Sequence, residues 1–218
     1  MIYKERLKMK FKMNVPNALT MFRIFCTPIM VLLFLLPIPN GVGGFTALGI
    51  YVLACFTDLL DGKIARKYNL VTDFGKFMDQ IADKFITTTA MILVLFEGIV
   101  WQWLAVVMLL VVVLRDILIS GIRMVAANKN FVIAADIYGK VKSLFLDVAS
   151  MVLMLYVGLT VTCSCEFVDY VKWAGLALMI VGVALSVMSC VNYSVKAVKA
   201  LTVNEKEVEE SPVEEDDE

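Results

Sequence analysis

The chain has 218 residues, of which 60% are hydrophobic and 19% charged, and its mean hydropathy is +0.81. These values lie outside the range of soluble globular domains and favour a protein embedded in a membrane. The 20 basic and 21 acidic residues nearly cancel, which gives no general attraction to nucleic acid, and the absence of histidine excludes imidazole catalysis and His-ligated zinc.

Residues 1–13 alternate basic side chains with apolar ones such as Ile2, Leu7 and Phe11. This pattern is typical of a short amphipathic helix that lies on the surface of an anionic bilayer. We therefore predict an interfacial helix before the first membrane span.

Six apolar segments follow, each close to the roughly 20 residues that a helix needs to cross a bilayer. They are residues 17–36, 42–60, 77–96, 100–120, 141–162 and 171–193. The predicted fold class is an all-α membrane protein with six transmembrane helices. Residues 14–200 form its one domain.

Basic residues gather in alternate connections between these segments, which indicates the orientation of the chain in the membrane. They precede the first segment, lie between the second and third and between the fourth and fifth, and follow the sixth, whereas the opposite connections contain only Lys172. This asymmetry places both termini and the two long polar loops in the cytoplasm. We therefore expect a multi-pass protein of the cytoplasmic (inner) membrane whose active site faces the cytoplasm.

Residues 201–218 are rich in acidic side chains and contain few apolar ones. Such a composition buries too little apolar surface to fold alone. We expect a solvated, disordered tail.

Four aspartates gather where the second segment ends and the third begins. Asp58 and Asp61 are three residues apart, and Asp79 and Asp83 are four apart, so each pair shares one helical face. Four carboxylates in one small volume repel each other, and a divalent cation with oxygen ligands relieves that repulsion. The sequence therefore predicts a Mg²⁺ or Mn²⁺ site with ligands from Asp58, Asp61, Asp79 and Asp83.

A purely structural role for the aspartates would instead require partner cations, and those near in sequence are Lys63, Arg66 and Lys84. A third possibility is an ion or proton transporter that uses the carboxylates as intramembrane sites. A transporter, however, gives no reason for Gly62, Ala65 and Arg66 at their fixed spacings.

The pattern Asp58-x-x-Asp61-Gly62-x-x-Ala65-Arg66, followed by Gly75-x-x-x-Asp79-x-x-x-Asp83, resembles the signature of the CDP-alcohol phosphatidyltransferase family. The resemblance implies a two-metal site of carboxylates in which Asp58, Asp61 and Asp79 hold the cations. Asp83 would complete the site as the general base that takes the proton of an alcohol. The alcohol would then attack a CDP-linked lipid and expel CMP, and the family resemblance also implies a homodimer.

The same signature implies the residues that contact the CDP-lipid: Asp58, Gly62, Ala65, Arg66 and Gly75. Gly62, Ala65 and Gly75 leave room for a ligand or a neighbouring helix. Arg66 offers a planar guanidinium for a diphosphate.

Over residues 13–199 the chain is similar to the branch of this family whose acceptor is glycerol 3-phosphate. The similarity includes an Asn14-to-Arg23 segment, an Arg115-Asp116 pair, a Ser-Gly-x-Arg motif and a Gly-Lys-x-Lys motif. An acceptor phosphate needs fixed cations beside the metals, and the candidates are Arg115, Arg123, Lys140 and Lys142. Inositol phosphate, serine or phosphatidylglycerol is the alternative acceptor, and Arg123, Lys140 and Lys142 also fit a role in membrane orientation alone.

Asp147 is a further carboxylate within the fifth apolar segment. Its partner is either a cation of the fourth segment or another polar group, and the sequence does not distinguish the two.

Overall fold

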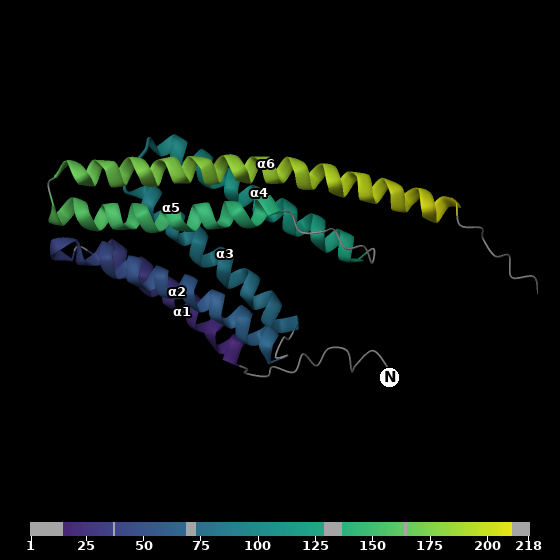
Figure 1. Ribbon diagram of the computed structural model, residues 1–218, viewed down its shortest axis with the longest axis horizontal. Coiled ribbons are helices and arrows are strands. Elements are labelled where there is room, and N and C mark those ends of the chain that lie inside the picture. Colours follow the sequence, from purple (N-terminus) through teal and green to yellow (C-terminus); the bar gives the residue numbers. More distant parts are fainter. Residues whose placement is uncertain (1–14, 37, 69–72, 129–136, 164, 211–218) are drawn as a thin grey trace, which may run out of the picture.

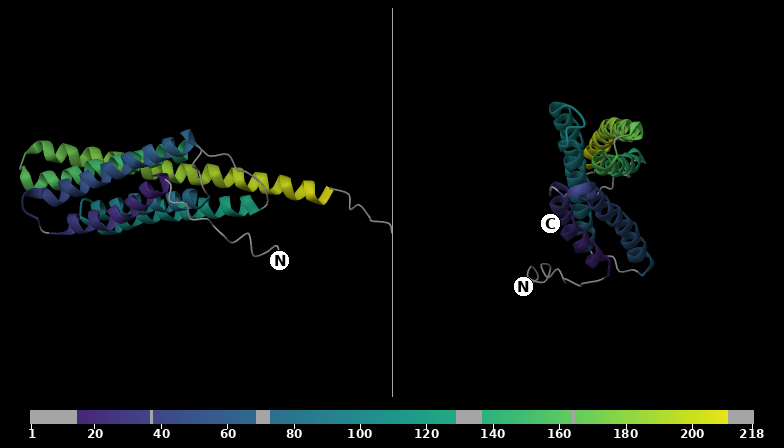
Figure 2. Two further views of the ribbon diagram at one scale, coloured as in Figure 1. Left: turned by 90° about the horizontal axis from the view of Figure 1, so that it is seen from below. Right: turned by 90° about the vertical axis from the view of Figure 1, so that its left-hand side faces the viewer.

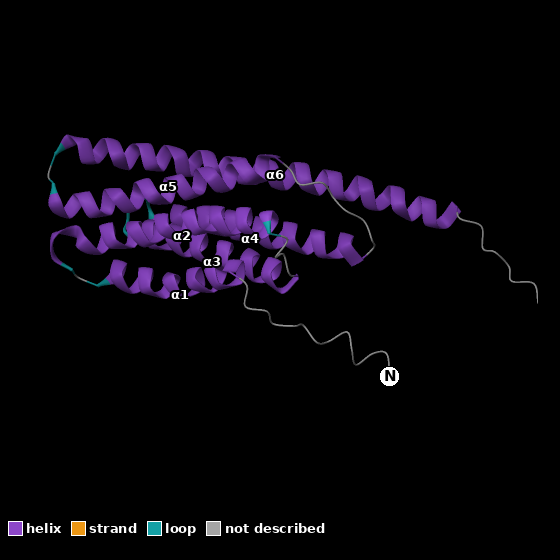
Figure 3. Ribbon diagram, turned by 60° about the horizontal axis from the view of Figure 1, so that its bottom comes forward, coloured by secondary structure: helices purple, strands orange, loops and turns teal. Residues whose placement is uncertain are grey.

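The computed structural model describes residues 15–36, 38–68, 73–128, 137–163 and 165–210, and over these ranges the regular structure is helical throughout (Figure 3). The six long helices are α1 (Val15–Leu35), α2 (Val42–Lys67), α3 (Asp73–Phe96), α4 (Gln102–Asn128), α5 (Ile137–Thr162) and α6 (Glu166–Glu210). A short 3₁₀ helix, η2 (Pro39–Gly41), connects α1 to α2. The interfacial helix predicted for residues 1–13 lies outside the described residues.

Five of these helices are long and apolar enough to cross a membrane: α1, α2, α4, α5 and α6. Helix α3 differs because Asp79, Asp83 and Lys84 interrupt its apolar sequence. The prediction of an all-α, multi-pass membrane protein is therefore confirmed. The sixth crossing, by α3, stays a prediction.

The helices form an elongated bundle in which α5 and α6 lie side by side along most of its length (Figures 1 and 2). Helix α1 packs against α2 and α3, and α2 and α3 both pack against α5. Buried side chains from these helices, including Met30, Tyr51, Val94 and Leu153, form one apolar core. Many large apolar side chains on the outer surface are exposed, as a lipid environment requires.

Glycines allow a close approach between the start of α2 and the end of α5. Gly41 has φ +68° and precedes α2, and a Cβ atom added to Gly44 would lie 2.8 Å from the backbone nitrogen of Gly158. These contacts place the first turn of α2 at the end of the bundle where α5 ends. Asp58 and Asp61, near the other end of α2, therefore lie toward the opposite end of the molecule.

Helix α6 extends to Glu210. Residues 201–210 are therefore helical, whereas the sequence predicted a disordered tail from residue 201. Those residues include Leu201, Glu205 and Lys206, which favour helices, and the next proline is Pro212. A favourable helical sequence can continue beyond the membrane without an apolar face. Residues 211–218 lie outside the described residues.

Candidate active site

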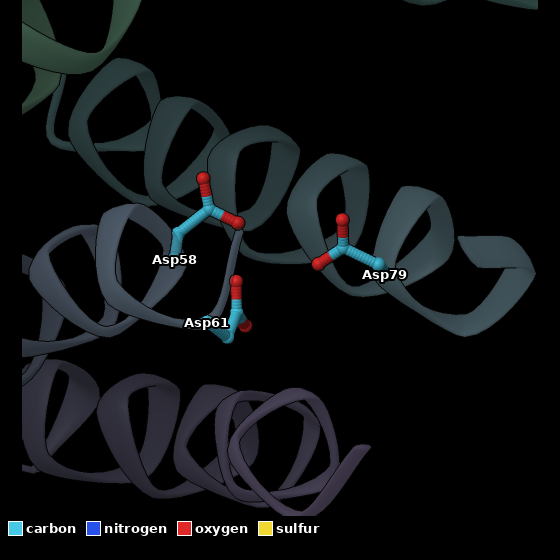
Figure 4. A group of neighbouring side chains, drawn as sticks. All are labelled: Asp58, Asp61 and Asp79. Carbon is cyan, nitrogen blue, oxygen red and sulfur yellow. The ribbon is translucent and has the colours of Figure 1, made fainter. Parts of the chain in front are cut away.

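Three of the predicted aspartates meet where the C-terminal half of α2 faces the N-terminal half of α3. One carboxylate oxygen from each of Asp58, Asp61 and Asp79 lies within 4.8 Å of the others. In Figure 4 the three side chains point toward one another from the two helices. Their spacing follows from helix geometry, because residues three apart on α2 share a face.

A basic side chain from α1 lies among these carboxylates. Nη1 of Arg23 donates to Asp58, and Nη2 donates both to Asp61 and, over 2.6 Å, to Oδ1 of Asp79. The Arg23 side chain is 1% exposed, so its charge is balanced almost entirely by these carboxylates. Three helices are thus joined at one polar centre within the bundle.

The structural alternative named only cations near in sequence, Lys63, Arg66 and Lys84, and it missed Arg23. Lys84 donates instead to the carbonyl oxygen of Asp116 and to Ser120 on α4, and Arg23 reaches the aspartates from a distant part of the sequence. A signal for Arg23 was present, since a charge inside an apolar helix requires a partner. Proximity in sequence was a poor guide because α1 packs directly on α2 and α3.

Asp83 lies one helical turn after Asp79 and is not among the three carboxylates that converge. Its side chain is exposed, and within the described residues it makes no hydrogen bond or ion pair. Asp58 and Asp147 are nevertheless close enough to interact with it electrostatically. The fourth predicted carboxylate is thus accessible beside the cluster and not part of it.

The glycines predicted to contact the CDP-lipid belong to the same region. Gly62 follows Asp61 directly on α2, and Gly75 lies in the first turn of α3, one turn before Asp79. The side chains of Ala65 and Arg66 lie outside the described residues. The structure therefore locates two of the predicted contacts beside the carboxylates and leaves two undescribed.

Two of the four predicted acceptor-phosphate residues meet at one carboxylate. Nη1 of Arg115 lies 2.8 Å, and Nζ of Lys142 2.5 Å, from Oδ1 of Asp116. Arg115 also donates to Ser189 on α6 over 2.5 Å, and Lys142 is buried. One carboxylate between two positive side chains leaves a net positive charge at this position. Lys84 adds to this charge, because its Nζ donates to the carbonyl oxygen of the same Asp116.

Of the other two predicted residues, Arg123 has a described side chain, and it does not join this cluster. Arg123 is exposed, and its Nε donates to the hydroxyl of Tyr193 on α6 over 3.3 Å, with the guanidinium 5.5 Å from the ring centre. The side chain of Lys140 lies outside the described residues. The structure thus brings together Arg115 and Lys142, but not Arg123.

Within the part of the chain that the structure describes, Asp147 binds hydroxyl groups and no cation of α4. Its Oδ1 accepts hydrogen bonds from Tyr51 over 2.9 Å and from Thr87 over 3.1 Å. It is also close enough to Asp58 and to Lys142 to interact with each electrostatically. Asp147 is therefore near both Asp58 of the aspartate cluster and Lys142 of the basic cluster, which consists of Arg115, Asp116 and Lys142. Its hydrogen bonds connect α5 to α2 and α3.

The donor set of the aspartate cluster fits a hard divalent cation. All three ligand groups are carboxylates, which Mg²⁺ and Mn²⁺ prefer, and the described residues of the cluster contain no thiolate that would favour a softer metal. One side of the cluster is open, since the side chains of Asp58 and Asp79 are 38% and 45% exposed. This open side would give an anionic ligand access to a cation held by the three carboxylates.

Comparison with known proteins agrees with this chemistry. Residues 13–188 match the family model of the CDP-alcohol phosphatidyltransferases, a range that includes α1 to α5 and the first half of α6. The chain belongs to this family.

Curated members of the family resemble the chain over most of its length. The CDP-diacylglycerol–glycerol-3-phosphate 3-phosphatidyltransferase of Bacillus subtilis (strain 168) is 32% identical over 178 residues, covering 77% of this chain and 90% of the relative. The Escherichia coli K12 protein of the same name is 33% identical over 182 residues, covering 83% and 92%. That of Wigglesworthia glossinidia brevipalpis is 35% identical over 134 residues, covering 61% and 71%.

Proposed function

We propose that this CDP-alcohol phosphatidyltransferase transfers the phosphatidyl group of CDP-diacylglycerol to glycerol 3-phosphate, giving phosphatidylglycerophosphate and CMP. The observation that carries the proposal is the convergence of Asp58, Asp61 and Asp79 within the family signature. The names of the curated relatives support the choice of acceptor.

In this proposal Asp58, Asp61 and Asp79 hold two divalent cations, either Mg²⁺ or Mn²⁺. When bound, the cations neutralise negative charge that develops on the CMP leaving group. Gly62, Ala65 and Gly75 leave space for the nucleotide, and Asp58 and Arg66 help to position the diphosphate.

Asp83 acts as the general base. Its accessible carboxylate accepts the proton of the acceptor hydroxyl, and the hydroxyl oxygen forms a bond to the β-phosphorus. The bond from that phosphorus to the bridging oxygen breaks, and CMP leaves with the electron pair. The step requires no covalent bond between protein and lipid.

Arg115 and Lys142 bind the phosphate of glycerol 3-phosphate. Asp116 holds the side chains of Arg115 and Lys142 in place. One carboxylate between two positive side chains leaves a net positive charge for an anionic ligand. In this proposal Arg123, near the end of α4, and Lys140, near the start of α5, supply further positive charge to the same phosphate.

In this proposal the protein lies in the inner membrane, and its active site faces the cytoplasm. Supporting this orientation, Lys63 and Lys67 lie on the same half of α2 as Asp58 and Asp61, whereas among the described residues the opposite end of the bundle holds a single basic residue, Lys172 near the start of α6. The homodimer implied by the family resemblance is part of the proposal, and chemical cross-linking in membranes tests it.

The experiment that tests the function measures CMP release by purified protein supplied with CDP-diacylglycerol and one acceptor at a time. Glycerol 3-phosphate is expected to support release, while inositol phosphate, serine and phosphatidylglycerol are not. Release with serine or inositol phosphate and none with glycerol 3-phosphate would replace the proposed acceptor. No release with any of the four would contradict the reaction itself.

A further inference from the structure

The Arg23 guanidinium lies among the three carboxylates that are proposed to hold the cations. It contacts Asp58 and Asp61 on α2 and Asp79 on α3, the same three residues whose oxygens lie within 4.8 Å of one another. The side chain is 1% exposed. Its Nε atom is buried and has no hydrogen-bond partner among the described residues, so the described hydrogen bonds of this guanidinium all go to the three aspartates.

A guanidinium and a divalent cation cannot both lie at these oxygens in the observed arrangement. Nη2 of Arg23 contacts both Asp61 and Asp79, so a divalent cation held by these carboxylates would compete with a positive group for the same oxygens. Two cations in contact repel strongly, and the Arg23 guanidinium is itself buried, which weakens the screening of that repulsion by water. Binding of the metal therefore requires the guanidinium to move.

We infer that Arg23 is the built-in counter-ion of the metal-free protein, which holds Asp58, Asp61 and Asp79 together and which divalent cations displace when they bind. The inference rests on the proposed metal site and goes beyond it by assigning a role to a residue of α1. Without a cation, three carboxylates on two facing helices would push α2 and α3 apart. Arg23 prevents this and ties both helices to α1.

This exchange has a thermodynamic consequence. An interaction that stabilises only the metal-free state lowers the apparent affinity for the metal. Removing Arg23 should therefore weaken the metal-free protein and strengthen metal binding. An ordinary structural arginine would predict the first effect without the second.

The experiment compares wild-type protein with Arg23→Gln, Arg23→Lys and the control Lys63→Gln. Lys63 is an exposed residue of α2 near the site, so its replacement removes one positive charge without removing a contact to the carboxylates. All proteins are purified in detergent with Mg²⁺ and then depleted of metal. Mn²⁺ binding is followed by electron paramagnetic resonance, and thermal unfolding by tryptophan fluorescence with and without Mg²⁺.

We expect Arg23→Gln to bind Mn²⁺ roughly tenfold more tightly than wild type, since charge-assisted hydrogen bonds of the metal-free state are lost. Its metal-free form should unfold at a lower temperature, and Mg²⁺ should restore most of the difference. Arg23→Lys should be intermediate, because one ammonium group cannot contact three carboxylates as the forked guanidinium does. Lys63→Gln should behave as wild type.

Unchanged or weaker Mn²⁺ binding by Arg23→Gln would overturn the inference while leaving the proposed metal site intact. The same conclusion would follow if Lys63→Gln changed affinity equally, because a general charge effect would then explain the result. If Arg23→Gln does not fold, Arg23→Lys decides by the same two measurements. Absence of Mn²⁺ binding to wild-type protein would overturn the metal site, and this inference with it.

Discussion

Asp79 and Asp83 are one turn apart on α3, yet their surroundings differ. Asp79 is part of the three-carboxylate cluster and contacts Arg23, whereas Asp83 is accessible and makes no hydrogen bond or ion pair within the described residues. A metal ligand must converge with other ligands, and a general base must remain free to accept a proton. The two positions match these different requirements.

Replacing each aspartate by asparagine separates the two roles. Asp83→Asn keeps the size of the side chain and removes its basicity, so kcat should fall roughly a hundredfold or more while Mn²⁺ binding stays near the wild-type value. Asp79→Asn should weaken Mn²⁺ binding itself. Nearly full turnover by Asp83→Asn would show that another group is the base.

At the basic cluster, Lys142→Gln should raise the KM for glycerol 3-phosphate. The expected loss in kcat/KM is roughly tenfold to a hundredfold, because a charge-assisted hydrogen bond contributes about 1.5–3 kcal/mol. The KM for CDP-diacylglycerol should change little. Lys172→Gln is the matched control, since Lys172 lies near Tyr156 on α5 and away from Asp116. An unchanged KM for glycerol 3-phosphate would remove Lys142 from the acceptor site.

At this scale the sequence predicted the residue types of the site better than their partners. The spacing placed Asp58 and Asp61 on one face of α2, and Asp79 and Asp83 on one face of α3, because helix geometry fixes which residues share a face. Of the second pair, Asp79 joins the described cluster and Asp83 does not. Arg23 was missed as a partner because its contact depends on how α1 packs, which no local spacing reveals. The choice of partner for Asp147 was open for the same reason.

At the scale of helices, Asp147 of α5 connects two helices that carry the site. Tyr51 is about two turns before Asp58 on α2, and Thr87 is one turn after Asp83 on α3, and both donate to Oδ1 of Asp147. These bonds fix how far α2 and α3 are shifted along α5. The relative position of the aspartates depends on that shift.

We expect Asp147→Ala to lower the unfolding free energy by about 1–3 kcal/mol, because it leaves the fully buried hydroxyl of Tyr51 without its acceptor. Asp147→Asn should cost less, since the amide oxygen can still accept both bonds. Thermal unfolding in detergent measures the difference. Equal stability of Asp147→Ala and wild type would mean that these hydrogen bonds do not hold the helices together.

Helix boundaries were predicted well where apolar sequence ended at a turn, as at residues 96 and 162, where α3 and α5 end. The predicted segments were too short where a helix continues beyond its apolar sequence, as α2 does to Lys67 and α6 does to Glu210. Hydropathy reports the part of a helix that lies in the membrane. It does not report helical turns in the aqueous layer, where propensity and capping decide.

For the molecule as a whole, the proposed orientation makes opposite predictions for its two ends. Cys163 and Cys165 are exposed between α5 and α6, at the end away from Asp58 and Asp61. In right-side-out membrane vesicles, a membrane-impermeant maleimide should label them. Lys63→Cys, in a background where both cysteines are serine, should be labelled only in inverted vesicles. The reverse pattern would place the site on the outer face.

The central claim is that the aspartate cluster uses a divalent cation to transfer the phosphatidyl group of a CDP-linked lipid to glycerol 3-phosphate, with release of CMP. The most direct test is the transfer of radiolabelled glycerol 3-phosphate into the lipid fraction by purified protein with CDP-diacylglycerol. Chelation should abolish the transfer, and Mg²⁺ or Mn²⁺ should restore it. Undiminished transfer after thorough removal of divalent cations would contradict the account.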